Sequence, residues 1–149
     1  MKPVNLDTIL LDAYEKYEPV AVKKQIQLQI SLPEETLPDC TCDRERISQV
    51  LSILLDNALS YTPLDGKISL SLSFSQGHFL IEVSDNGPGV ADGDKKHIFE
   101  RFYRADNAHT KKEHFGLGLC VANEIIKAHK GKIWVEDRVP CGASFFILL

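Results

Sequence analysis

Hydrophobic positions in the first half of the chain follow a helical period, then an alternating one, then a helical one again. Between residues 5 and 17 the apolar positions are spaced by three and four, which predicts a helix capped by Asn5 or Asp7. Residues 25–32, QIQLQISL, alternate strictly and predict a half-buried strand. After a turn-rich connection that can end in a short strand, residues 43–62 predict a long helix, which a proline and a glycine terminate.

The second half predicts two hairpins separated by a long polar segment and one helix. KISLSLSF and HFLIEVSD are two strands joined by a short turn, which predicts an antiparallel hairpin. Residues 91–115 are polar, with at most a short helix around DKKHIFERF, and such a long irregular segment is more typical of a functional lid than of a linker. GLGLCVANEIIKAH predicts a helix opened by glycines, and KIWVEDR and ASFFILL predict the last two strands.

This order of elements predicts an α/β fold of two layers. A mixed, mainly antiparallel sheet is expected to be covered on one face by three helices, because each element must bury its apolar face against another. The sequence contains no internal repeat and no visible domain boundary. Residues 1–149 are therefore expected to form a single domain, which is an ordinary length for one.

Composition excludes some classes of function without selecting one. Hydrophobic residues make up 44% and charged residues 26% of the 149 residues, and the net charge of −4 argues against a broad nucleic-acid surface. No apolar run approaches the roughly 20 residues that span a bilayer. Of the four cysteines, Cys40 and Cys42 form a C-x-C that is too close for easy disulfide geometry and lacks the partners of a zinc site. Reduced thiols favour a cytosolic setting.

Asn57 is the first residue with candidate chemistry. It lies with Ile53, Ser60 and Tyr61 on a helix flank at spacings of three and four, beside the predicted core stripe. Its amide oxygen is a suitable ligand for a hard cation such as Mg²⁺. An ordinary helix-surface asparagine is the alternative.

Two glycine-rich stretches are further candidates. Asp85 ends an apolar strand and carries a carboxylate that only accepts hydrogen bonds, while Gly87 and Gly89 permit the close approach of a planar ring. A tight turn is an equally good explanation of that stretch. Gly116 and Gly118 open a helix whose free N–H groups form an anion site, although G-x-G alone is a weak signal.

The predicted lid contains IFERFYR at residues 98–104. Its two phenylalanines can anchor the segment to the body, and its cations supply positive charge, although a solvated charged loop is the alternative. The residues concerned are Phe99, Phe102, Arg101, Arg104, Lys111 and Lys112.

Taken in order and spacing, LLDNALSYT, DNGPGV, IFERFYR, GLGL and the late GAS resemble the N, first glycine, F, second glycine and third glycine boxes of the sensor histidine kinases. The match covers residues 45–149, and the first 44 residues are similar to the family's lead-in to its ATP-binding domain. The resemblance implies the two-layer sandwich with an ATP lid (the Bergerat-type fold) that gyrase-type ATPases, mismatch-repair ATPases and heat-shock chaperones share. It also implies ATP and Mg²⁺ as cofactors.

The resemblance assigns roles to the matched residues. Asp85 would accept the exocyclic amine of adenine, a charged hydrogen bond worth roughly 1.5–3 kcal/mol, and would repel the carbonyl of guanine. Asn57 would hold Mg²⁺ bridging the phosphates, and Asn57 and Arg104 would be the catalytic residues. The implied nucleotide-binding set is Asn57, Tyr61, Asp85, Gly87, Gly89, Val90, Phe99, Arg101, Arg104, Lys112, Gly116, Leu117, Gly118 and Leu119.

Three positions depart from the pattern of that family. Many members have an asparagine where Ile53 stands, a lysine where Ser60 stands and a glycine where His114 stands. The first change removes a polar group near the expected metal, and the second removes a phosphate contact that Lys111 or Lys112 can replace. The third stiffens the lid and can place an imidazole near the phosphates.

A kinase of this family also needs an acceptor histidine on a helix, beside an acid and ahead of a Thr-Pro. None of the five histidines has that setting: His78, His97, His109, His114 and His129. The chain is therefore expected to be a monomeric catalytic fragment of a larger kinase. The acceptor-histidine helical domain, the sensor and any membrane span would lie upstream, and a response regulator would be served indirectly. The fragment itself is expected to be cytoplasmic, without membrane or nucleic-acid contact, within a protein that is membrane-anchored as a whole.

Two other functions stay open at this point. A stand-alone ATPase or chaperone of the same fold would place a water-activating glutamate where Ile53 stands, and isoleucine cannot accept a proton. Asp56 adjoins Asn57 but lies about 100° around the helix from it. The other alternative is a degenerate nucleotide-binding module that serves only for signalling contacts.

Overall fold

The computed structural model describes residues 1–101, 103 and 118–149 and contains a mixed five-stranded sheet. The strand order is β2-β4-β5-β7-β6, and only β2 and β4 run parallel. This confirms the mainly antiparallel sheet expected from the alternating segments. The strands are β2 (Gln27–Ser31), β4 (Lys67–Ser75), β5 (His78–Asp85), β6 (Lys132–Asp137) and β7 (Ala143–Leu148).

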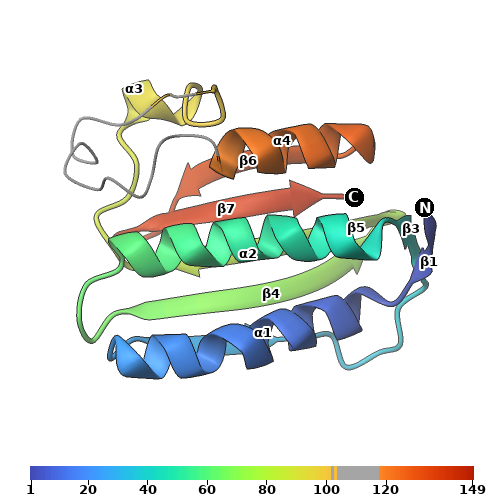
Figure 1. The fold of residues 1–149 in the computed structure, drawn as a ribbon, viewed down its shortest axis with the longest axis horizontal. Helices are drawn as coiled ribbons and strands as arrows, with labels where there is room; N and C mark the ends of the chain where they lie inside the picture. Colours follow the sequence, from blue (N-terminus) through green and yellow to red (C-terminus); the bar gives the residue numbers. More distant parts are fainter. Residues whose placement is uncertain (102, 104–117) are drawn as a thin grey trace.

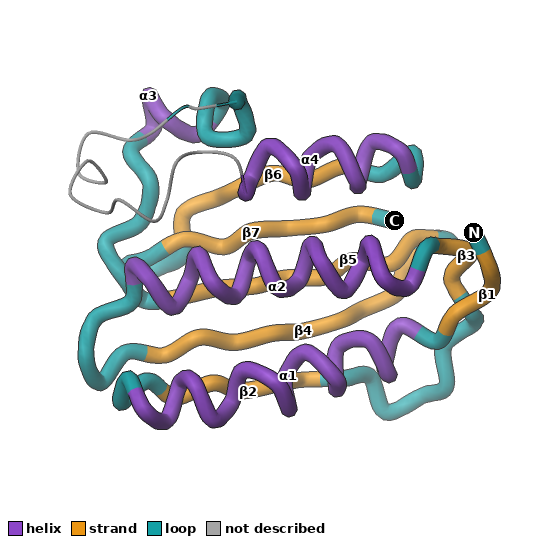
Figure 2. Tube along the Cα trace, in the orientation of Figure 1, coloured by secondary structure: helices purple, strands orange, loops and turns teal. Residues whose placement is uncertain are grey.

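Three helices cover one face of this sheet and form the second layer (Figures 1 and 2). Because their apolar stripes and the inward residues of the strands are buried together, the core lies between the two layers. The predicted two-layer sandwich is confirmed. The covering helices are α1 (Leu6–Lys23), α2 (Arg44–Tyr61) and α4 (Gly118–Ala128), and the short α3 (Asp92–Lys95) lies apart from them (Figure 1).

Helix α1 starts where the sequence predicted but ends six residues later. Asn5 is its cap, with Oδ1 accepting the backbone N–H of Asp7 at 2.9 Å. The prediction that the helix ends at Tyr17 was wrong, because α1 continues through Pro19 to Lys23. The fully buried Ala21 gives the last turn a packing surface against the sheet, which offsets the N–H that proline lacks.

Helix α2 follows the prediction closely. The side chain of Asp43 accepts the N–H of Arg46 at 3.2 Å and caps the helix. Its predicted apolar stripe is buried against the sheet and the two neighbouring helices. The buried residues are Ile47, Val50, Leu51, Leu54, Leu55, Ala58 and Leu59.

A small two-stranded ladder near the N-terminus joins β1 (Lys2–Val4) to β3 (Cys40–Cys42). The short strand at the cysteines was expected, whereas β1 was missed because three residues are too few to show a period. The cysteines of the chain are free thiols, and burial raises the pKa of the Cys42 thiol to about 12. None of the described helices has both the length and the apolar run that crossing a membrane requires.

His129 ties the end of α4 to the beginning of α2. Its Nε2 accepts the backbone N–H of Asp43 at 3.0 Å, and its Nδ1 lies 2.8 Å from the carbonyl oxygen of Ile125. A carbonyl oxygen only accepts, so Nδ1 is the donor in this contact. This imidazole therefore joins two of the three covering helices at the end of the molecule that bears the small ladder.

We expect His129→Ala to lower the free energy of unfolding by roughly 0.5–1.5 kcal/mol, because both hydrogen bonds are lost. Urea denaturation monitored by circular dichroism measures the change. His78→Ala is the matched control, since that exposed side chain has no hydrogen bond among those of the described residues. Equal losses for the two variants would show that the bridge contributes nothing specific.

Candidate functional site

Asp85 lies at the end of β5, the middle strand of the sheet. Only 5% of it is exposed, and its Oδ1 accepts the backbone N–H of Gly87 at 2.9 Å. Burial raises the pKa of this carboxyl group, while the N–H groups of Gly87 and Ala143 and the charge of Arg138 act in the opposite direction. A carboxylate has about four acceptor positions, so Asp85 retains capacity for a donor from a ligand.

The turn after Asp85 packs against the end of α2. A Cβ on Gly87 would lie 2.8 Å from the carbonyl oxygen of Tyr61 and 3.1 Å from Asp85 Oδ1. Any side chain would push this turn away from the helix, so the close approach requires glycine. The sequence segment DNGPGV is therefore more than a hairpin turn, because it attaches a buried carboxylate to the helix that carries Asn57.

Asn57 is half-buried on α2, four residues before Tyr61 and four residues after Ile53. The beginning of α4 contacts α2 at Ile53, where a Cβ on Gly118 would lie 3.4 Å from Cγ2. Residues four apart lie on the same side of a helix. Asn57 is thus placed between the Asp85 turn on one side and the N-terminus of α4 on the other.

Asp56 is directed elsewhere. It lies close enough to Tyr17 on α1 to contribute to the raised pKa of that phenol, whose largest cause is burial. Ile53, at the position of a possible water-activating glutamate, instead packs against the core and the beginning of α4. Neither Ile53 nor Asp56 therefore offers a proton acceptor on the side of α2 that carries Asn57.

The segment that follows the Asp85 turn is anchored to the body by aromatic and ionic contacts. Phe99 meets Phe145 edge-to-face with ring centroids 6.2 Å apart, and Tyr103 donates its hydroxyl to Asp94. Lys95 pairs with Asp92 on the same helix and with Asp137 on β6, at 2.9 Å for the second pair. The predicted anchoring role of Phe99 is consistent with this contact.

The structure brings several predicted residues together. The group around α2 comprises Asn57, Tyr61, Asp85, Gly87 and Gly118. Gly89 packs against Gly142. Val90, Phe99 and Leu119 are half-buried against the core, and Arg101 is exposed. The predictions at Phe102, Arg104, Lys111, Lys112, His114, Gly116 and Leu117 lie outside the described residues.

Two residues of this region were not identified from the sequence. Gly142 has φ +101, and a Cβ there would lie 1.9 Å from the carbonyl oxygen of Asp85, so the β6–β7 turn packs directly on the acid. The GAS motif was the available signal, but it was not assigned to the site. Thr62 is 7% exposed, and its Oγ1 has no hydrogen-bond partner among the described residues. No sequence pattern marked it.

Residues 42–149 match the family of histidine kinase-, DNA gyrase B- and HSP90-like ATPases. The chain belongs to this family. Membership in this ATPase family implies a nucleotide-binding module, in agreement with the buried acceptor and the helix N-terminus on either side of Asn57. The resemblance inferred from the sequence motifs is thus confirmed.

Relatives of this ATPase domain include sensor kinases. The adaptive-response sensory kinase SasA of Synechocystis sp. is 34% identical over 149 residues, which cover 99% of this chain and 38% of SasA. The sensor protein CiaH of Streptococcus pneumoniae is 45% identical over 104 residues, which cover 69% of this chain and 23% of CiaH. The chain therefore spans well under half the length of these relatives.

The fold agrees with a solved histidine kinase domain. The nucleotide-free catalytic domain of histidine kinase ThkA superposes with a TM-score of 0.87 at 30% identity, covering 99% of this chain and 93% of the ThkA domain. This chain therefore matches the catalytic domain of a histidine kinase over almost its whole length.

Proposed function

We propose that this chain binds Mg-ATP beside α2 and donates the γ-phosphoryl group to a histidine on a separate helical domain. It would thus be the kinase module of a two-component sensor. The observation that supports this most directly is the placement of Asn57, with the Asp85 turn and the beginning of α4 contacting α2 one helical turn to either side. Phosphoryl transfer depends chiefly on positioning and on charge stabilisation, for which this arrangement is suited.

Asp85 would select the base. Its buried carboxylate accepts hydrogen bonds only, so it pairs with the exocyclic amine of adenine and repels the carbonyl at the same position of guanine. Gly87 and Gly89 leave the backbone of the turn without side chains against which the ring would clash. The preference for adenine would arise at the end of β5, where Asp85 lies.

Asn57 and α4 would hold the phosphate end. The amide oxygen of Asn57 is a suitable ligand for Mg²⁺, which takes few protein ligands and completes its shell with phosphates and water. The N-terminus of α4, with Gly118 and Leu119, presents backbone N–H groups and the positive end of the helix dipole to anions. When bound, Mg²⁺ supplies charge neutralisation along the triphosphate. Tyr61, Arg101, Arg104, Lys112, Gly116 and Leu117 are proposed to add phosphate contacts, and Val90 and Phe99 to support the base of the lid.

The acceptor histidine is proposed to lie outside this chain. His129 is engaged between two helices, and Nδ1 of His97 lies 3.0 Å from a carboxylate oxygen of Glu100, so both imidazoles have structural partners. The proposed partners are the acceptor-histidine helical domain of the same kinase and, indirectly, a response regulator. ThkA has been solved in complex with response regulator protein TrrA, which supports the second. As a module of this kind, residues 1–149 would form one monomeric domain without nucleic-acid or membrane contact.

Transfer from γ-labelled ATP to a supplied acceptor-helix domain tests the proposal. The expected product is an acid-labile, alkali-stable phosphate on the acceptor domain that appears only when this chain and Mg²⁺ are both present. An acceptor domain with its histidine replaced by alanine is the control. Rapid release of inorganic phosphate by the chain alone, without labelling of the acceptor, would instead establish a stand-alone ATPase.

We expect Asp85→Asn to weaken ATP binding by about ten- to a hundredfold, because a charged hydrogen bond to the adenine amine is lost. Isothermal titration with Mg-ATP measures the change. Asp39→Asn is the matched control, since Asp39 is exposed and precedes β3 near the beginning of α2, whereas the Asp85 turn contacts the end of that helix. An unchanged affinity in Asp85→Asn would exclude the adenine assignment while leaving the phosphate end of the site untested.

The same substitution has a distinct effect on the nucleotide-free protein. The pKa of Asp85 is higher in the folded chain than in the unfolded one, so the folded state binds more protons between the two values. Its contribution to stability is therefore greatest below the unfolded pKa and falls as the pH rises through the folded pKa. Unfolding at pH 4 and pH 7 should show that the stability of Asp85→Asn relative to the parent protein increases with pH.

A further inference from the structure

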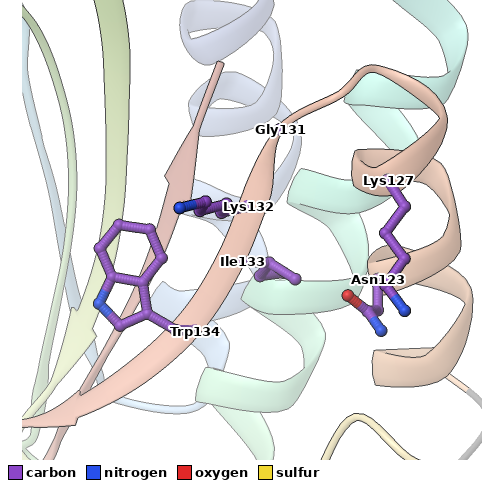
Figure 3. Close-up of a pocket in the computed structure, with 6 residues that line it drawn as sticks. All are labelled: Asn123, Lys127, Gly131, Lys132, Ile133 and Trp134. Carbon is purple, nitrogen blue, oxygen red and sulfur yellow. The ribbon is translucent and has the colours of Figure 1, made fainter.

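A groove lies between α4 and β6, the strand at the end of the sheet order (Figure 3). Its hollow has a volume of about 390 Å³ and is lined by Asn123, Lys127 and residues 131–134. None of these residues belongs to the set predicted to bind nucleotide. The proposed kinase site therefore does not account for this groove.

Among the described residues, the outer side of β6 has no strand partner along this groove. β6 is the last strand of the sheet order, so no described strand lies beyond it. Arg138 N–H donates to the carbonyl oxygen of Gly142 at 3.1 Å in the antiparallel register of β6 and β7. Because alternate residues of an antiparallel strand bond to the same neighbour, the even-numbered residues of β6 bond toward β7. The N–H and C=O groups of Ile133 and Val135 consequently point to the free edge.

Apolar side chains lie on both sides of this edge. In Figure 3, Ile133 is directed toward α4, where Asn123 and Lys127 lie, and Trp134 projects from the opposite face of β6. The Trp134 ring stacks on Phe146 with centroids 5.4 Å apart, which fixes the indole. An extended ligand would thus find one apolar contact above the strand and one below it, at the period of two that strands share.

The charged residues that line the groove are lysines, whereas Glu136, which accepts the indole N–H of Trp134 at 2.6 Å, lies on the Trp134 side of β6. Lys127 and Lys132 line it, and Lys130 lies in the turn between α4 and β6. Within the part of the chain that the structure describes, none of the ion pairs involves these three lysines. The groove therefore favours a ligand that carries carboxylates.

We propose that this groove binds an extended acidic segment of a partner protein, which adds to the sheet as a strand beside β6. Its backbone would pair with Ile133 and Val135, its acidic side chains would face Lys127 on the α4 side, and its apolar side chains would contact Trp134 on the opposite face. Main-chain pairing would supply affinity, and Lys127 would supply selectivity for acids.

A single peptide strand fits this edge better than a second copy of the chain. α4 runs along β6 at the border of the molecule (Figure 1). Continuing the sheet into a second copy would bring two α4 helices together at a strand spacing of about 5 Å, whereas packed helices need about 8–10 Å. One added strand brings no second helix, so it avoids this clash.

Trp134 provides the probe, because it is the only tryptophan of the chain. The ligand is a blocked peptide of sequence Ser-Glu-Val-Glu-Ile-Asp-Ser, titrated into the intact chain without nucleotide. We expect a saturable change in tryptophan fluorescence and slower amide exchange at Ile133 and Val135. A peptide with lysines in place of its acids, and one with alternate backbone nitrogens methylated, should each bind at least about tenfold more weakly.

Lys127→Glu is expected to weaken peptide binding by about fivefold or more. Lys23→Glu is the matched control, because it changes a lysine in the last turn of α1, at the opposite edge of the sheet. Both lysines are exposed, so both variants should fold, which circular dichroism checks. Absence of a fluorescence change, equal binding of the three peptides, or self-association that covers Trp134 in sedimentation would each overturn the proposal. Mg-ATP binding is measured separately, so failure of the groove is distinguishable from failure of the kinase site.

Discussion

Gly142→Ala is expected to lower the free energy of unfolding by roughly 2–6 kcal/mol. Gly142 has φ +101, a conformation in which a side chain is strained by about 1–3 kcal/mol. The added Cβ would also lie 1.9 Å from the carbonyl oxygen of Asp85, and backbone cannot rotate away as a flexible side chain can. Relieving such a contact by shifting the chain costs roughly 1–3 kcal/mol more.

Denaturant unfolding of the nucleotide-free protein measures this loss. Gly93→Ala is the control, because a Cβ there meets nothing within 4 Å. It should change stability by no more than roughly 1 kcal/mol. A comparable, small change in both variants would mean that the β6–β7 turn yields easily and does not press on Asp85.

The consequence of this contact reaches the proposed adenine site. The β6–β7 turn supports the peptide that follows Asp85, and Gly89 in turn lies against Gly142, with the carbonyl oxygen of Gly142 3.1 Å from a Cβ on Gly89. The carboxylate is therefore held by three segments that are far apart in sequence: the turn after β5, the β6–β7 turn and the end of α2. A Gly142→Ala protein that does fold should bind ATP more weakly than the parent protein.

Clear periods explain which parts of the fold were predictable from the sequence. Residues 43–62 bury one continuous helical stripe, and β4 alternates buried and less buried positions over most of its length, so local pattern and tertiary burial agree. The end of α1 was not predictable in the same way, because Pro19 indicates termination and only tertiary packing of Ala21 overrides it. β1 exists only because β3 lies beside it, and such a partner leaves no periodic trace.

In the candidate site, too, the features with a local sequence pattern were predictable and those that depend on tertiary contacts were not. Asp85, Gly87 and Asn57 were identified because their motifs combine unusual residue types at fixed spacing. What motifs cannot give is the meeting of separate segments. The contact of Gly118 with Ile53 and that of Gly142 with Asp85 join residues more than fifty positions apart, so they follow from the fold and not from any local pattern. The departure at Ile53 thereby acquires a structural explanation, since an apolar side chain there packs against the beginning of α4.

Asn57→Ala should reduce phosphoryl transfer to the acceptor domain by roughly a hundredfold or more, the cost of losing one group that holds developing charge in place. The amide oxygen would be the only ligand that α2 contributes at this position, because Ile53 on one side is apolar and Asp56 is directed toward α1. Adenine recognition at Asp85 does not involve Asn57. ATP affinity measured without Mg²⁺ should therefore change much less than the transfer rate.

The dependence on Mg²⁺ distinguishes loss of a metal ligand from a general disturbance of α2. In Asn57→Ala the Mg²⁺ concentration that half-saturates transfer should rise, and excess Mg²⁺ should recover part of the rate. Asn123→Ala is the matched control, because it removes the same half-buried amide from α4 at a place remote from the Asp85 turn. Loss of a metal ligand must change both the transfer rate and the Mg²⁺ concentration that half-saturates it. A slow Asn57→Ala protein with an unaltered Mg²⁺ requirement would therefore show that Asn57 positions the helix or the phosphates without holding the ion.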